Sequence, residues 1–403
     1  MPQFDLRDHC RAIRSELLAA FGEVLDAGQF ILGPNVSAFE EEMAAYLGVA
    51  HTVAVNSGTD ALILALRGLG VGAGDEVVTS AFTFVSPAEA ASLLGARPVF
   101  VDIEADGFNL DPGRLEAALS PRTRAIVVVH LFGQAADLEP VLEMARLHGI
   151  AVVEDACQAI GADYRGRKVA AWGSAGCLSF FPTKNLGALG DGGLLSTSDP
   201  ALASRVRALR VHGSGPKYHH RMTGYNSRLD ELQAAVLRVK LKHLEGWIAR
   251  RIEIAKGYDE RLRAAGLTEW LILPAHRTYG RHVFHQYALR VLSGVRDALR
   301  EHLAKKGIGT AVYYPVPLHL QEVYRGLGYR LGDLPRAERA AAEVLCLPMF
   351  PELRPEQQDR VVEEIAGFFK TRREGSRHSG SCYLQQPREA RGQSALPRGP
   401  LGA

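Results

Sequence analysis

Short runs rich in Val and Ile alternate with helical patterns through the first part of this 403-residue chain, and this alternation limits the fold more than any other feature. Apolar runs lie at 52–55, 76–79, 98–103 and 125–129, and amphipathic segments separate them. Short runs rich in Val and Ile that alternate with helices are typical of strands buried on both faces, as in a parallel sheet. The pattern predicts an α/β fold in which helices cover both faces of a mainly parallel sheet.

The pattern changes after a long helical segment at 230–264, which we expect to contain a domain boundary. Beyond it, predicted strands and helices mix in the order 285–292, 295–306, 309–314, 334–345 and 355–369. We therefore expect a large domain at 1–245 and a smaller α+β domain at 246–370. Residues 371–403 are rich in Arg, Ser, Gly and Pro and lack apolar clusters, which predicts a disordered tail.

The stretch from Val152 to Gly193 carries two informative side chains. An expected buried strand ends at Asp155, and Lys184 follows within Phe-Phe-Pro-Thr-Lys-Asn, before a glycine-rich run. These are the two protein groups that pyridoxal phosphate (PLP) needs, because an amine forms an imine with its aldehyde and a carboxylate keeps its ring nitrogen protonated. Taken singly, each has a simpler interpretation, as a solvated loop lysine and as a turn-forming Asp.

A second candidate site lies where the strand at 52–55 meets the helix expected from residue 60. The junction reads Asn56-Ser57-Gly58-Thr59. The first-turn N–H groups of a helix lack intrahelical partners and the helix dipole is positive there, so such a junction binds anions. The same residues also suit an ordinary helix N-cap, and this motif by itself leaves both interpretations open.

Five motifs in this order resemble the DegT-type sugar aminotransferases, a fold-type I PLP family, over residues 4–370. The motifs are Asn56–Leu62, Glu154–Ala159, Ser179–Gly187, Gly224–Asp230 and Tyr314–His319. The resemblance implies the fold-type I PLP aminotransferase fold, with the large and small domains described above, and PLP as the cofactor. It implies Lys184 and Asp155 as the catalytic residues.

The resemblance also implies roles for further residues. Phe84 would stack on the cofactor ring and Gln158 would lie beside the ring oxygen. Asn226 would reach the phosphate of a neighbouring subunit, which implies a homodimer with shared active sites, and the apolar link at 29–34 is expected near the site's mouth. The remaining implied contacts are Ser57, Gly58, Thr59 and Ser179 with the phosphate, and Arg228, Tyr314 and His319 with the substrate.

The implied reaction is transamination from an amino acid donor, expected to be glutamate, to a keto nucleotide sugar, which gives an amino sugar. A lysine at position 184 argues against the deoxygenating relatives, which carry a histidine there. The run Phe-Phe-Pro-Thr-Lys-Asn-Leu-Gly is typical of members that aminate C3. A 4-keto sugar, a cyclitol acceptor and a non-catalytic, PLP-binding regulatory protein remain alternatives, and the sequence names neither the sugar nor the nucleotide.

Composition restricts the partners and the location. With 47 basic and 45 acidic residues, no overall charge favours nucleic acid or a membrane surface. The chain lacks the ~20 consecutive apolar residues that span a bilayer, and its first residues lack a secretion signal. The five cysteines and 14 histidines show no metal-binding spacing, and His130 is expected to be a core or rim residue. We expect a cytoplasmic enzyme without a metal.

Overall fold

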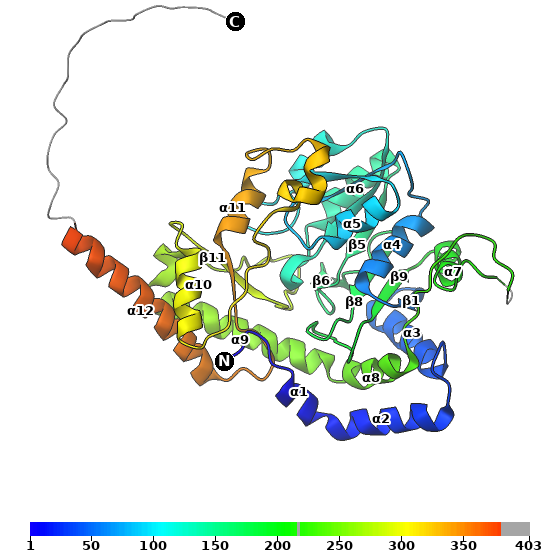
Figure 1. The fold of residues 1–403 in the computed structure, drawn as a ribbon, viewed down its shortest axis with the longest axis horizontal. Helices are drawn as coiled ribbons and strands as arrows, with labels where there is room; N and C mark the ends of the chain where they lie inside the picture. The colour runs from blue at the N-terminus through cyan, green and yellow to red at the C-terminus, as the bar shows by residue number, and fades with distance from the viewer. Residues whose placement is uncertain (216–217, 380–403) are drawn as a thin grey trace, which may run out of the picture.

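A computed structural model describes residues 1–215 and 218–379, with side chains through residue 373. The described chain forms a large part around a central sheet and a smaller part beside it, and the long helix α9 (Leu244–Ala264) runs along both (Figure 1).

In the described chain the central sheet has seven strands, in the order β1-β9-β8-β5-β4-β2-β3. Only β9 runs antiparallel to its neighbours β1 and β8, and the other adjacent strands pair in parallel. The predicted α/β class with a mainly parallel sheet is confirmed. The strands are β1 (His51–Val55), β2 (Glu76–Ser80), β3 (Arg97–Val101), β4 (Thr123–Val129), β5 (Ala151–Asp155), β8 (Ala175–Ser179) and β9 (Gly193–Thr197).

Helices cover both faces of this sheet because alternate residues of each strand point to opposite sides. In β4, Ile126 and Val128 enter one core, and Ala125 and Val127 enter the other. The first core contains side chains of α3 (Pro34–Leu47), α6 (Leu138–His148) and α8 (Glu231–Leu241). The second contains side chains of α4 (Gly58–Gly68), α5 (Ser86–Leu93) and α7 (Pro200–Leu209).

The smaller part has an antiparallel sheet of β10 (Leu271–Ile272), β11 (Tyr287–Val291) and β12 (Val344–Leu347). Helices α10 (Arg296–Lys305), α12 (Pro355–Ser379) and the second half of α9 pack on it. The prediction of a strand at 309–314 is wrong, since only an isolated bridge joins Ala311 to Cys346 in this segment. The helix expected at 334–345 is α11, but it covers only Pro335–Glu343. The last two residues of the expected range belong to β12, because a short apolar run does not by itself distinguish strand from helix.

The helical segment expected at 230–264 is two helices, since α8 ends at Leu241 and α9 begins at Leu244. Ile248 packs in the core of the large part, whereas Tyr258 and Leu262 pack in the core of the small part. The boundary at residue 245 stays a prediction. Helix α12 extends beyond residue 370, where the tail was expected to begin, and the predicted tail residues 380–403 lie outside the described chain.

Two helices, α1 (Arg7–Ala12) and α2 (Arg14–Ala27), begin the chain. The segment before them packs on the small part: Met349 N donates to Gln3 O at 3.2 Å, and Phe4 joins the core of that part. The N-terminal segment therefore belongs structurally to the C-terminal half of the chain.

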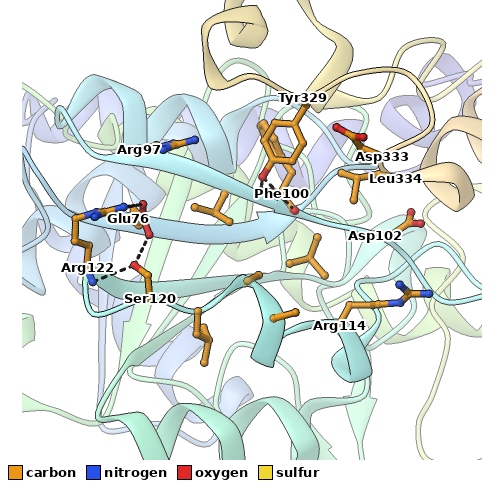
Figure 2. Close-up of a pocket in the computed structure, with 15 residues that line it drawn as sticks. Glu76, Arg97, Phe100, Asp102, Arg114, Ser120, Arg122, Tyr329, Asp333 and Leu334 are labelled. Carbon is orange, nitrogen blue, oxygen red and sulfur yellow. Dashed lines mark hydrogen bonds and ion pairs between the residues drawn. The ribbon is translucent and has the colours of Figure 1, made fainter.

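The edge strand β3 is protected from pairing with another chain. Pro98 has no N–H to offer, and the Tyr329 hydroxyl accepts a 2.9 Å hydrogen bond from Phe100 N, as Figure 2 shows. At the start of β2, the Glu76 carboxylate accepts from Ser120 Oγ at 2.5 Å and pairs with Arg122 at 2.7 Å (Figure 2). All of these residues except Pro98 line a depression of about 430 Å³, in which the Glu76 carboxylate is paired with groups of its own chain.

Within residues 1–215 and 218–379, no helix has the length and apolar content to cross a bilayer. The same residues contain no cluster of His, Cys, Asp or Glu arranged to hold a metal ion.

Candidate active site

A cavity of about 400 Å³ opens at the carboxyl ends of the parallel strands. Val129 ends β4, Asp155 ends β5 and Ser179 ends β8, and all three line it. Ligands of open α/β sheets bind at this edge. The small part supplies the opposite wall through two pairs of residues, His285-Gln286 and Tyr313-Tyr314.

Asp155 and Lys184 line the same cavity although they come from separate segments. The Asp155 carboxylate accepts a 3.1 Å hydrogen bond from Cys157 N, which fixes its orientation at the strand end. Lys184 lies in a tight turn in which its own N–H donates to Phe181 O at 2.8 Å. Burial lowers the pKa of Lys184, and the nearby Cys157 and Asp155 oppose this shift. The amine is therefore closer to its neutral, nucleophilic form than a solvated lysine.

The neighbouring acid, Glu154, has a different role because successive strand residues face opposite sides. Its buried carboxylate accepts from Trp172 N at 2.6 Å, from Gly173 N at 2.8 Å and from His130 at 3.1 Å. The carboxylate thus ties β5 to the loop before β8. His130 is fully buried, which confirms a core position for this residue.

The N-terminus of α4 forms one end of the cavity. Ser57 caps the helix by accepting from Asp60 N at 3.1 Å, and Thr59 shares a 2.7 Å hydrogen bond with Ser86. A side chain at Gly58 would meet Cys157 Sγ and the Ser179 β-carbon at 2.7 Å, so glycine lets this helix end approach β5 and β8 closely. The N-cap interpretation therefore holds, and it leaves the helix end facing the cavity as an anion-binding surface.

An aromatic and amide wall faces the strand ends. The ring centroids of Phe84 and Tyr314 are 6.0 Å apart, and 52% of Phe84 is exposed. Gln158 accepts from Phe132 N at 2.8 Å and donates to the Tyr314 hydroxyl at 3.1 Å, which fixes its amide orientation. Burial raises the pKa of Tyr314, so its hydroxyl keeps its proton.

Three of the predicted site residues do not line this cavity. Asn226 is exposed and Arg228 is half-buried, both on the segment that follows α7. His319 has no exposed side-chain surface and contacts Glu338 at 3.1 Å. His319 is enclosed by its own chain, and its substrate contact stays a prediction.

The remaining predicted residues come together around the cavity: Ser57, Gly58, Thr59, Phe84, Asp155, Gln158, Ser179, Lys184 and Tyr314. Their individual roles stay predictions.

Four further residues at or near the site were not anticipated. His285 and Gln286 precede β11, and Tyr313 lies beside Tyr314; all three line the cavity. Gln3 donates to Gln286 at 2.9 Å and accepts from the Tyr313 hydroxyl at 3.4 Å, so the N-terminal segment supports this wall. No motif marks these positions, because folding alone brings them together.

His285 is the most unusual of these residues. Only 4% of it is exposed, and its Nδ1 has no hydrogen-bond partner in the described chain. Burial, and then the positive charges of Lys184 and Arg251, lower its pKa well below the ordinary value. His285 is therefore a neutral imidazole beside the lysine at neutral pH.

Exposed apolar side chains surround the mouth of the cavity. Phe84 and Phe181 line it and are each about half exposed. Leu189 lies two residues before the cavity-lining Asp191, and its N–H donates to Gln233 of α8 at 2.8 Å. Phe30 adjoins the same end of α8, where its carbonyl oxygen accepts from Glu231 N. We define the mouth patch as Phe30, Ile31, Phe84, Phe181 and Leu189, each at least 40% exposed.

Comparison with known proteins identifies the family. A sequence profile of the DegT/DnrJ/EryC1/StrS aminotransferase family matches residues 11–366. The chain belongs to this family. The resemblance found from the motifs is thus confirmed, and with it the fold-type I aminotransferase fold.

Relatives of this aminotransferase carry both enzymatic and regulatory names. This chain is 49% identical to a pleiotropic regulatory protein from Geobacillus stearothermophilus, over 92% of this chain and 99% of the relative. It is 46% identical to the UDP-N-acetyl-3-dehydro-alpha-D-glucosamine 3-aminotransferase of Acidithiobacillus ferrooxidans, over 91% and 97%. The crystal structure of S. venezuelae DesV in complex with a ketimine intermediate superposes with a TM-score of 0.88 at 46% identity, over 91% and 99%.

Proposed function

We propose that this aminotransferase uses PLP to move an amino group from an amino acid, expected to be L-glutamate, to C3 of a keto nucleotide sugar. The observation that carries the proposal is that Lys184, Asp155 and the N-terminus of α4 meet at one cavity. These supply an amine, a carboxylate and an anion-binding helix end, the three groups that hold the aldehyde, ring nitrogen and phosphate of PLP.

The donor set fits PLP in further ways. The exposed face of Phe84 is available for ring stacking, and Gln158 is held in one orientation beside it. Ser57, Gly58, Thr59 and Ser179 surround the helix end and would hold the phosphate. When bound, PLP supplies an aldehyde that carries the amino group and a ring that accepts electrons.

Lys184 would act first as the anchor and then as the proton carrier. Because burial lowers its pKa, its amine takes a proton from the donor's α-carbon more readily than a solvated lysine, which stays protonated. Asp155 would keep a proton on the ring nitrogen. Tyr314, Arg228 and His319 remain the proposed substrate contacts.

A homodimer with shared sites is the proposed assembly. Among the described cavity-lining residues, Lys184 is the only lysine or arginine, yet a nucleotide sugar and an amino acid both bring negative charge. Asn226 is exposed outside its own cavity, while the adjacent Ser227 is anchored to Asp60 of α4 by a 2.6 Å hydrogen bond. A second copy seated on the mouth patch would cover its apolar surface and bring Asn226 and cationic side chains to the site. We also propose that the enzyme is located in the cytoplasm.

The proposal that the amino group goes to C3 of the sugar is based on the names of relatives. The Acidithiobacillus enzyme is named for amination at C3 and shares 46% of its residues with this chain. A 4-keto sugar and a cyclitol remain alternative acceptors. The Geobacillus relative's name raises a regulatory role, but here the lysine and carboxylate are both present in one cavity, which favours catalysis.

One assay tests the proposal. The purified protein is incubated with PLP, L-glutamate and a panel of 3-keto and 4-keto nucleotide sugars and a keto cyclitol, and 2-oxoglutarate is measured. We expect 2-oxoglutarate with 3-keto sugars. Formation of 2-oxoglutarate only with 4-keto sugars or only with the cyclitol would change the proposed acceptor. PLP binding without 2-oxoglutarate formation with any acceptor would favour the regulatory alternative.

A further inference from the structure

Lys184 lies between two cavities. One is the active-site cavity, and the other is a small enclosed space of about 10 Å³ against the same loop. Of the described residues, Lys184 is the only one that lines both. The small cavity is closed by residues of the N-terminal segment, the lysine loop, α9 and the segment before α12, and the residues used below are His9, Asn185, Arg251 and Glu352.

Three polar atoms from different segments around this small cavity lack partners. They are Asn185 Oδ1, Arg251 Nε and Glu352 Oε2, each buried and without a hydrogen bond in the described chain. Buried polar atoms in folded proteins are almost always paired with protein or water. Three unpaired atoms around one cavity therefore point to a shared partner.

The same three side chains are fixed by their other atoms. Asn185 Nδ2 donates to Val283 O at 3.2 Å, and the second Glu352 oxygen contacts His9 at 3.0 Å. Arg251 Nη1 donates to Met349 O at 3.2 Å. Rotation to pair the three free atoms with one another would break these bonds.

The chemistry of the three atoms matches one molecule. Two are acceptors and one is a donor, and a water molecule has two hydrogens to give and a lone pair to receive. A space of about 10 Å³ is at the lower limit for a single water and is too small for a larger ligand. The buried guanidinium also disfavours a cation.

We infer that one ordered water binds in this cavity, donating to Asn185 and Glu352 and accepting from Arg251, and that it positions the loop that carries Lys184. Asn185 directly follows Lys184. Arg251 also donates to the carbonyl oxygens of Phe284 and His285, at 3.2 and 3.5 Å. The water thus joins the lysine loop to the backbone of the opposite wall. The water site stands independently of the proposed function, and only its effect on Lys184 rests on that proposal.

A crystal structure of the PLP-loaded protein at a resolution that shows ordered water tests the site directly. We expect density within hydrogen-bond distance of Asn185 Oδ1, Arg251 Nε and Glu352 Oε2. A dry cavity, or three side chains paired directly with one another, would overturn the inference.

Variants test the positioning role. Asn185→Leu and Glu352→Met each remove one of the two proposed acceptors of the water, together with the Asn185 bond to Val283 O or the Glu352 contact with His9. We expect each to lower the Tm of the cofactor-free protein by about 2 °C or more. We also expect each to shift the pH midpoint of the visible absorbance of the PLP-loaded protein by roughly half a unit or more.

Gln358→Met is the matched control. This buried amide donates to Ile254 O at 2.7 Å in the same small part of the protein and lines neither cavity. We expect it to lower Tm without moving the absorbance midpoint. If the two test variants behave like this control, the positioning role is wrong. If neither the wild type nor any variant shows visible absorbance after incubation with PLP, that result would instead contradict the proposed function.

Discussion

The inner end of the active-site cavity and its mouth are built differently. At the inner end, polar groups are held by the chain itself: Asp155 accepts from Cys157 N, Ser57 from Asp60 N, and Gln158 from Phe132 N. At the mouth, the five side chains of the mouth patch are exposed and apolar. One chain therefore fixes the polar groups of the inner end, whereas it leaves the apolar side chains of the mouth uncovered.

The largest expected effect is at the inner end. Lys184→Ala removes the only amine among the described lining residues, so we expect turnover to fall by on the order of 10³-fold or more, together with loss of the visible absorbance of bound PLP. Steady-state release of 2-oxoglutarate and an absorbance spectrum measure both. Lys168→Ala, at a lysine paired with Glu245 outside the cavity, is the control and should retain both signals. Full activity in Lys184→Ala would contradict the assigned role.

The next effect tests the mouth. Ile31→Asp places a charge in the mouth patch, and we expect the dimer dissociation constant to rise by about 10²-fold. Analytical ultracentrifugation over a concentration series measures this. Leu147→Asp alters a still more exposed apolar residue, 65% against 42% for Ile31, which lies on α6 outside the patch, and it should leave the assembly unchanged. Equal behaviour of the two variants would show that the patch is not the interface.

A smaller effect is expected at Asn226. Asn226→Ala removes one proposed hydrogen bond to the cofactor phosphate, which should weaken PLP binding by about tenfold. Titration of the cofactor-free protein with PLP measures the change.

Subunit mixing then tests whether Asn226 acts on its partner. A hybrid of one Lys184→Ala chain and one Asn226→Ala chain has one intact site if Asn226 reaches across the interface. Activity at limiting PLP should therefore recover on mixing. No recovery, with hybrids demonstrated by mass spectrometry, would place Asn226 at its own subunit's site.

The smallest effect concerns pH. The pKa of His285 is lowered in the folded protein, so the unfolded chain binds its proton more readily below about pH 6.5. The contribution of the neutral histidine to the free energy of unfolding is fully present above that pH. It is lost as pH falls, by up to about 1.4 kcal/mol per pH unit. Denaturant unfolding at several pH values should show this decline in wild type and a shallower decline in His285→Asn. Parallel pH profiles would show that His285 is not the group responsible.

Local patterns predicted the positions of Asp155 and Ser57 because each lies at the end of a regular element. Asp155 is the last residue of β5, and Ser57 caps α4, so the strand and helix patterns placed them at the sheet edge. The small-part wall could not be predicted in this way. Gln286, Tyr313 and Gln3 lie on irregular segments, and their contacts join residues hundreds of positions apart.

The errors have the same origin. β12 is a short apolar run next to a helix, and it becomes a strand because it pairs with β11. The role of His319 stays a prediction, but only the structure shows that its side chain contacts Glu338. Sequence position does not state side-chain direction in an irregular segment.

By itself, the sequence determined the alternating order of strands and helices, the family, and Lys184 and Asp155 as the candidate catalytic pair, because these depend on local pattern and residue type. Only the tertiary structure decided which side chains share the cavity, that Lys184 also borders a second, water-sized space, and that the mouth exposes apolar surface. These depend on packing between distant segments, which no local pattern records.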